Sequence, residues 1–133
     1  MTRVVLDTNV LVASAYNAES ASRRIVEACR RGELVLVVSP AIRREYDRIL
    51  PRAIRRPGAR EEIDALLEQA EVVTPAETPR VVPDDPEDDK FISAATAGNA
   101  DALITNDEHL LKAASNARVR VVQPSAFHSA GFE

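Results

Sequence analysis

The sequence predicts one three-layer α/β/α domain that spans residues 1–133 and is built on a parallel sheet of about five strands. Short runs of branched apolar residues alternate with longer segments of helical periodicity from one end of the chain to the other. Strands that are separated by helices pair in parallel and leave those helices on both faces of the sheet. A length of 133 residues, without a repeat or a low-complexity segment, fits a single core.

Five short apolar runs are expected to form the strands. The first contains Val4, Val5 and Leu6, and such branched runs are typical of buried strands. The five runs cover residues 4–6, 34–38, 72–74, 102–105 and 119–122. Residues 75–87 contain four prolines and are expected to form a loop within the domain.

Start and stop signals bound the expected helices. Asn9 is a suitable N-cap for the first helix, and Ser39 followed by proline is typical of a helix start. Pro51 is expected to stop or bend that helix, and Gly98 with the asparagine after it suits a C-cap. The expected helices cover residues 10–16, 20–31 or 22–31 ending at Gly32, 40–50, 60–70, 88–97 and 108–114, with a final turn at 124–127.

Composition indicates a globular protein of the cytoplasm. Apolar residues make up 45% and charged residues 29% of the chain, which is ordinary for a soluble domain. No apolar run approaches the ~20 residues of a membrane span, and we expect neither a membrane segment nor a signal peptide. The single Cys29 excludes an intrachain disulfide and suits a reducing compartment.

Charge is distributed unevenly along the chain, although the net charge is only −4. Residues 23–60 hold 11 arginines against 4 acids, a balance of +7, whereas residues 61–107 have a balance of −11. A basic arm beside an acidic pocket could grip a phosphate backbone and present a metal to it. The alternative is an arginine-biased composition without function, since 15 of the 17 basic residues are arginine.

Four acidic residues are the candidate catalytic and metal-binding groups. Asp7 and Asp107 each follow an expected strand, so both should lie at the carboxyl edge of the sheet, where α/β proteins bind ligands. Glu45 borders the apolar face of its helix. Asp88 lies in the first turn of the helix expected over residues 88–97 and projects onto the buried stripe of that helix. Two carboxylates at ~4 Å repel by about 4 kcal/mol at a dielectric of 20. A shared Mg²⁺ or Mn²⁺, which prefers hard oxygen ligands, would offset that repulsion.

Each acid also has a purely structural interpretation. Asp7 and Asp107 could cap the helices that follow them, and Asp88 could favour a helix dipole. Glu45 could pair with Arg44 or Arg48. The joint placement of all four favours the metal site over these separate roles.

Further residues are candidates for contact with the metal or the substrate. Asp85 and Asp89 could replace Asp88 or hold a second metal ion. Polar side chains at the strand ends could orient a metal-bound water or touch the phosphate, although such residues are also good turn and cap formers. The proposed substrate contacts are Thr8, Asn9, Ser39, Thr105, Asn106, Arg43 and Arg44. Affinity for RNA is expected to come from Arg23, Arg24, Arg43, Arg44 and their neighbours.

Four segments in order resemble the acidic motifs of PIN-domain (PilT N-terminus) nucleases. The opening Val-Val-Leu-Asp7-Thr-Asn-Val-Leu-Val resembles the first motif, and Ser39 with Glu45 the second. Asp85-Pro-Glu-Asp88-Asp-Lys-Phe-Ile and Ala-Leu-Ile-Thr-Asn-Asp107 resemble the third and fourth. The resemblance covers nearly the whole chain and is strongest to VapC-like toxins of toxin–antitoxin systems. One departure is Asn106, where this branch commonly has glycine.

The resemblance implies a PIN-like fold and an endoribonuclease that depends on Mg²⁺ or Mn²⁺. Asp7, Glu45, Asp88 and Asp107 carry over as metal ligands. It further implies RNA as the substrate, a small antitoxin protein that blocks the active site, and a homodimer.

Three alternatives remain open at this point. A haloacid-dehalogenase-type phosphatase would need a second aspartate where Asn9 stands. A response-regulator receiver domain would need an acidic pair after the first strand, where only Asp7 is found. A PIN-like module that binds RNA or protein without cutting it would keep the same acids.

Overall fold

The computed structural model describes residues 1–75, 89–112 and 119–129. Within these ranges the sheet has five strands in the order β3-β2-β1-β4-β5, and all neighbouring strands are parallel. The strands are β1 (Arg3–Leu6), β2 (Val35–Val38), β3 (Glu71–Val72), β4 (Ala102–Ile104) and β5 (Val121–Val122). The predicted three-layer α/β/α class is therefore confirmed.

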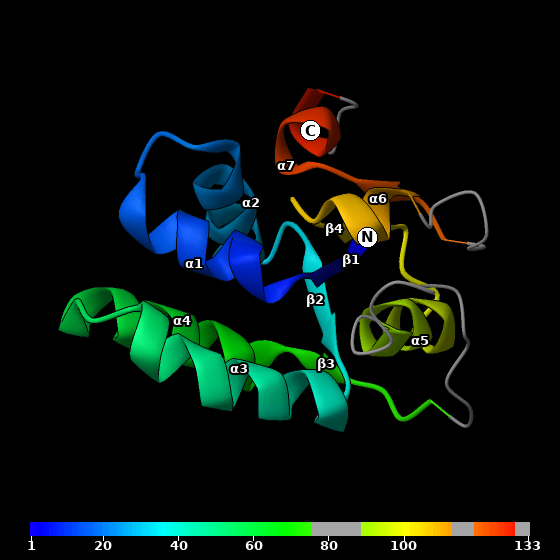
Figure 1. The fold of residues 1–133 in the computed structure, drawn as a ribbon, viewed down its shortest axis with the longest axis horizontal. Helices are drawn as coiled ribbons and strands as arrows, with labels where there is room; N and C mark the ends of the chain where they lie inside the picture. The colour runs from blue at the N-terminus through cyan, green and yellow to red at the C-terminus, as the bar shows by residue number, and fades with distance from the viewer. Residues whose placement is uncertain (76–88, 113–118, 130–133) are drawn as a thin grey trace.

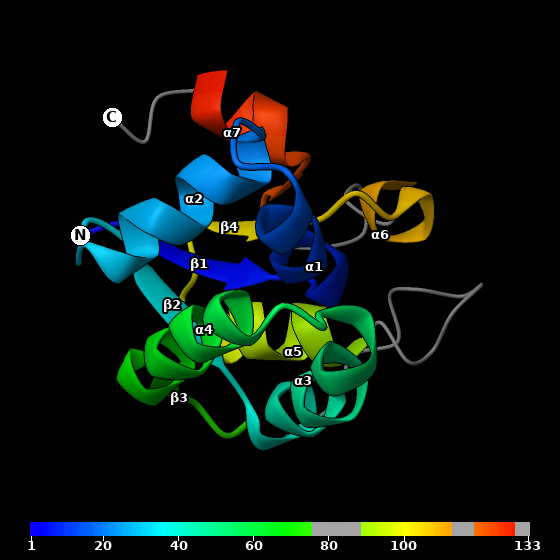
Figure 2. The same cartoon turned by 90° about the vertical axis from the view of Figure 1, so that its left-hand side faces the viewer.

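Within the described ranges, seven helices surround the sheet. They are α1 (Thr8–Tyr16), α2 (Ala21–Arg30), α3 (Pro40–Ala53), α4 (Pro57–Gln69), α5 (Asp89–Ala97), α6 (Glu108–Lys112) and α7 (Pro124–Ser129). In Figure 1, α1 and α2 lie on one side of the strands and α5 on the other, while α3 and α4 run below. Figure 2 shows the layers from the side, with α2 and α7 above the strands and α3, α4 and α5 beneath them. None of the helices in the described ranges is long and apolar enough to cross a bilayer.

The core lies between these layers and is formed by the expected apolar runs. The side chains of Val4, Val5 and Leu6 in the central strand β1 are fully buried, as are Leu103 and Ile104 in β4. A strand that is buried on both faces must be continuously apolar, which explains why these runs do not alternate with polar residues. The apolar runs of the sequence are therefore the strands of the buried sheet.

Two helix boundaries differ from the prediction. The N-cap of α1 is Asp7 and not Asn9, so the helix begins directly after β1. Pro51 lies inside α3, which continues to Ala53. Pro51 is exposed, and the Ile54 N–H donates to the Leu50 carbonyl at 2.8 Å, so the helix continues past the missing proline N–H at the cost of one hydrogen bond.

Other boundaries shift by a few residues. Helix α4 begins at Pro57, which takes the first helical position, whereas a start at residue 60 was predicted. Strand β3 is only two residues long, Glu71–Val72. Helix α7 extends to Ser129 and is longer than the single turn predicted. The predicted loop lies mostly outside the described residues, as does the end of the helix predicted over 108–114.

The burial of Cys29 predicts that its thiol is unreactive in the folded protein. Cys29 is 4% exposed, and desolvation raises the pKa of its thiol to about 12. Since the thiolate is the reactive form, folded protein should not react with Ellman's reagent at pH 8, and should react fully in guanidinium chloride. Rapid labelling of the native protein would contradict this packing of α2.

Candidate active site

Asp7 is the first residue after β1, the central strand. Its backbone takes the N-cap position of α1, but its side chain makes no capping hydrogen bond. Instead, Asp7 Oδ2 accepts hydrogen bonds from Thr105 Oγ1 at 2.6 Å and from Asn9 Nδ2 at 3.1 Å. The carboxylate is therefore held at the carboxyl edge of the sheet, with 6% of the residue exposed.

Asp107 reaches the same edge from the end of β4. The Asp7 N–H donates to the Ile104 carbonyl at 2.9 Å, which aligns the ends of the two strands. Thr105 joins them, because its hydroxyl donates to Asp7 and accepts from the Asp107 N–H at 2.9 Å. Asp107 Oδ1 also accepts the His109 N–H at 2.7 Å, so this carboxylate caps α6 as the structural interpretation suggested. Asp107 therefore both caps α6 and lies beside Asp7.

Glu45 comes from α3, whose start matches the prediction. Ser39 Oγ accepts the Ile42 N–H at 3.2 Å, and Pro40 takes the first helical position. The buried Tyr46 hydroxyl donates to the Leu6 carbonyl, which fixes this part of α3 against the end of β1. Glu45 is thereby brought beside α1, where its Oε2 accepts the Thr8 hydroxyl.

Lys90 is the counter-ion of Glu45. Its Nζ lies 2.8 Å from Glu45 Oε1, and the two side chains are only 15% and 11% exposed. The alternative structural interpretation, in which Glu45 pairs with Arg44 or Arg48, is not what α3 forms. Sequence reasoning missed Lys90, although one signal was present: it stands in the first turn of α5, where the helix dipole disfavours a cation. A lysine there calls for an anionic partner.

The three described carboxylates interact electrostatically. Burial raises the pKa of the Asp7 carboxyl, and the charges of Glu45 and Asp107 raise it further. The Thr105 hydrogen bond acts in the opposite direction and lowers it. Desolvation and like charge both oppose ionisation, so a bound cation would favour the ionised form of Asp7.

The donor set fits a hard divalent cation in its chemistry. Carboxylate oxygens from Asp7, Glu45 and Asp107 are the ligands that Mg²⁺ and Mn²⁺ prefer. Among residues 1–75, 89–112 and 119–129, however, no three acid, histidine or cysteine side chains lie close enough to hold one ion together. The predicted ligands Asp85 and Asp88 lie outside the described residues, and so does the side chain of Asp89.

The predicted substrate contacts other than the arginines lie partly at the same edge of the sheet. Thr8, Asn9 and Thr105 each bond one of the carboxylates directly. The Asn106 N–H donates weakly to Asn9 Oδ1 at 3.4 Å, and the Asn106 side chain is exposed. Ser39 is buried as a helix cap, and lines a cavity of about 200 Å³ together with Lys90 and other residues.

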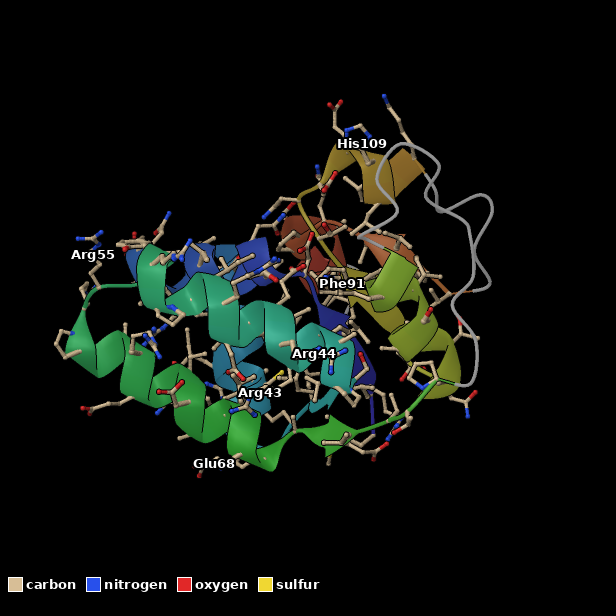
Figure 3. The ribbon with its side chains drawn as sticks, turned by 60° about the horizontal axis from the view of Figure 1, so that its bottom comes forward. Arg43, Arg44, Arg55, Glu68, Phe91 and His109 are labelled. Atoms are coloured by element: carbon tan, nitrogen blue, oxygen red, sulfur yellow. The ribbon has the colours of Figure 1, made fainter. Side chains whose placement is uncertain are left out.

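The arginines that were predicted to contact the substrate differ in whether they already form a salt bridge within the protein. Arg43 Nε pairs with Asp47 Oδ1 at 3.2 Å, and Arg23 pairs with Glu27 at 3.1 Å. Arg44 is exposed and makes neither a salt bridge nor a side-chain hydrogen bond to the described part of the chain. Figure 3 shows Arg43 and Arg44 near the beginning of α3. Arg44 is therefore freer than Arg43 to meet a ligand.

Comparison with models of known protein families identifies the family of this chain. The model of the family described as PIN domain matches residues 3–122, which is most of the chain. The chain belongs to the PIN domain family. PIN domains are generally nucleases that use a divalent metal for catalysis. Among curated proteins, none matches this chain.

Solved structures share the fold of this PIN domain at low sequence identity. One chain of VapBC2 from Rickettsia felis, crystallised with a DNA fragment from their promoter, has a TM-score of 0.60 at 15% identity, over 92% of this chain and 98% of that one. PAE2754 from Pyrobaculum aerophilum has a TM-score of 0.60 at 16% identity, with 96% and 88% covered. A domain of a functionally unknown protein from Methanocaldococcus jannaschii has a TM-score of 0.57 at 18% identity, with 92% and 91% covered. These likenesses establish the fold of the PIN domain across almost its full length.

Proposed function

We propose that this PIN domain is a divalent-metal-dependent endoribonuclease and the toxin of a toxin–antitoxin pair. The observation that carries the proposal is the gathering of Asp7, Glu45 and Asp107, from three separated segments, at the carboxyl edge of one sheet. Asp7 is buried, and the other two charges act on its carboxyl group. Lys90 compensates Glu45, but Asp7 and Asp107 form no salt bridge within the described residues, and like charges that lie together are costly unless a cation joins them.

The hydrogen bonds around the site have clear roles in such a reaction. Thr105 and Asn9 hold the Asp7 carboxylate in place. Thr8 and Lys90 hold the Glu45 carboxylate through its two oxygens. A bound Mg²⁺ or Mn²⁺, for which Asp88 would complete the ligand set, supplies the activation of water and offsets charge on the phosphate. Hydrolysis of this kind leaves a 5′-phosphate and a 3′-hydroxyl and needs no side-chain nucleophile.

The toxin part of the proposal is supported by the likeness to a chain of VapBC2. We propose that a cognate antitoxin protein covers the carboxylate edge and that the toxin forms a homodimer. The proposed RNA substrate and the lone buried thiol of Cys29 both suit the cytoplasm.

Metal removal gives the direct test. Purified protein should cleave a pool of transfer and messenger RNA with Mn²⁺ and should be inactive in excess chelator. Adding back Mn²⁺ should restore cleavage, because the carboxylates hold the ion directly. The products, resolved on a denaturing gel, should be substrates for a ligase that requires 5′-phosphate ends.

Two results would contradict the proposal. RNA that is bound but left intact at every metal concentration would identify a PIN module that binds without cutting. Hydrolysis of a small phosphomonoester, with RNA untouched, would indicate a phosphatase instead.

A further inference from the structure

Helices α1 and α3 run side by side in the same direction, starting from the carboxylates. At one end, the Thr8 hydroxyl donates to Glu45. At the other end, the Tyr16 hydroxyl donates to the carbonyl of Ala53. Each helix advances eight residues between these two contacts, which is about 12 Å along its axis. The two helices therefore form a paired surface that begins at the candidate active site.

An arginine row follows α3 along this surface. Arg44, Arg48 and Arg52 are four residues apart, so they fall within ~80° of one another around the helix. Arg55 stands just beyond the last turn, and Figure 3 shows Arg44 and Arg55 at opposite ends of α3. All four side chains are exposed. Within the described part of the chain, none of them makes a salt bridge or donates a side-chain hydrogen bond, unlike Arg43, which pairs with Asp47.

The row ends beside an exposed aromatic ring. Tyr16 is 54% exposed, although its hydroxyl is anchored to Ala53. The neighbouring Arg56 donates from Nη1 to the Ala15 carbonyl at 3.0 Å, so the end of α1 and the chain around the end of α3 each donate one hydrogen bond to the other. An aromatic ring that is fixed at its hydroxyl and about half exposed can accept a stacked base.

We propose that the arginine row (Arg44, Arg48, Arg52 and Arg55) and Tyr16 bind single-stranded RNA and lead it to the carboxylates. This inference rests on the proposed function, whose substrate class it specifies. The arginines would contact successive phosphates, and Tyr16 would stack on one base about 12 Å from Glu45.

Single-stranded RNA fits this surface better than an acidic protein does. Both ligands would meet the positive charge, but a protein partner would also need apolar residues to bury. The exposed large apolar residues in the described ranges are Met1, Tyr16 and Val72, and of these Tyr16 adjoins the row. One open ring at the end of a line of cations matches a base on a charged backbone.

Binding can be measured without cleavage by working in chelator. The probe is a short, fluorescently labelled single-stranded RNA, and the dissociation constant is measured by anisotropy at several salt concentrations. The logarithm of the association constant falls as the logarithm of the salt concentration rises, and each phosphate contact on a single strand contributes about 0.7 to the steepness of that fall. Replacing Arg48 and Arg52 together by alanine should therefore make the slope less steep by about 1.4. The matched control replaces Arg31 and Arg120, which are also exposed but precede β2 and β5 at the opposite edge of the sheet, and should leave the slope unchanged.

Tyr16 is tested by two variants that separate stacking from anchoring. Tyr16→Phe keeps the ring and loses the hydroxyl bond to Ala53, so it should bind RNA nearly as tightly as the parent. Tyr16→Leu lacks the ring and should bind about five-fold more weakly or worse. Circular dichroism and thermal melting check that each variant is folded, and a glutamine pair at Arg48 and Arg52 replaces the alanine pair if that one does not fold.

Three outcomes would overturn the inference. The first is an equal salt slope in the arginine pair and its control. The second is equal weakening by Tyr16→Phe and Tyr16→Leu, which would make Tyr16 a structural anchor. The third is polyglutamate that binds as tightly as RNA and does not respond to Tyr16, which would assign the surface to an acidic protein. Since these assays contain no metal, a failure of RNA cleavage leaves their result intact.

Discussion

Asp7→Asn should reduce metal-dependent RNA cleavage by at least 10²-fold, while the protein stays folded. The amide has the same shape, and its oxygen can still accept the Thr105 hydroxyl bond that Asp7 Oδ2 accepts at 2.6 Å. It lacks the charge that a divalent cation requires, and losing a group that stabilises developing charge typically costs about 10²–10³ in rate. Single-turnover cleavage with Mn²⁺ measures the effect. Asp101→Asn is the control, because Asp101 accepts the Arg3 N–H at the opposite edge of the sheet.

The same variant should be more stable than the parent at neutral pH. The pKa of Asp7 is raised in the folded protein, mainly by burial and then by Glu45 and Asp107. Between the unfolded and the folded pKa the native state binds more protons than the unfolded state, so stability falls as pH rises through that window. Above the folded pKa the full cost of the buried charge is present, and Asp7→Asn removes it. Thermal melts from pH 4 to pH 8 without metal should show a flatter profile for Asp7→Asn.

Metal should reverse this order of stability. Mn²⁺ should raise the melting temperature of the parent, because a ligand that binds only the folded state stabilises it, and should hardly affect Asp7→Asn. Full cleavage activity in Asp7→Asn, or an equal Mn²⁺ effect on both proteins, would remove Asp7 from the metal site.

Lys90→Met should lower the stability of the metal-free protein by about 3 kcal/mol. Lys90 and Glu45 form an ion pair that is mostly buried, and removing one partner of such a pair leaves an uncompensated charge. For a domain of this size the loss corresponds to a fall in melting temperature of roughly 10 °C. Glu45 would then be left beside Asp7 without its cation. Thermal and denaturant unfolding in chelator measure the change.

The Lys90 variant should also respond more strongly to metal. Because Lys90 no longer holds Glu45, Mn²⁺ should raise the melting temperature of Lys90→Met by more than it raises that of the parent. Lys112→Met is the matched control, since Lys112 is an exposed lysine at the end of α6. An identical Mn²⁺ response in parent and Lys90→Met would mean that Lys90 and the metal do not share Glu45.

The fold and the placement of three of the acids could be predicted from local sequence patterns. Asp7 and Asp107 follow buried strands, and parallel topology sends the carboxyl ends of such strands to one edge. Helical periodicity placed Glu45 at the border of the buried face of α3. These inferences needed only the spacing of apolar residues along the chain.

Details that depend on tertiary contacts could not be predicted in this way. Asp7 replaces Asn9 as the N-cap because β1 and α1 follow one another without a linker. Pro51 stays in α3 because it is exposed at a place where one backbone hydrogen bond can be lost. Lys90 meets Glu45 across 45 residues of sequence, and no local pattern encodes that pairing. The predicted role of Asp88 stays a prediction.

The anchoring of α1 to α3 at both ends has a consequence for how RNA would be cut. Thr8 is tied to Glu45 and Tyr16 to the backbone at Ala53, so the two helices cannot slide past one another without breaking a contact. The separation between the carboxylates and the aromatic ring is then a fixed ruler of about 12 Å. With one phosphate for each arginine, four residues or about 6 Å apart along α3, that ruler would set the cleavage point roughly two nucleotides from the clamped base.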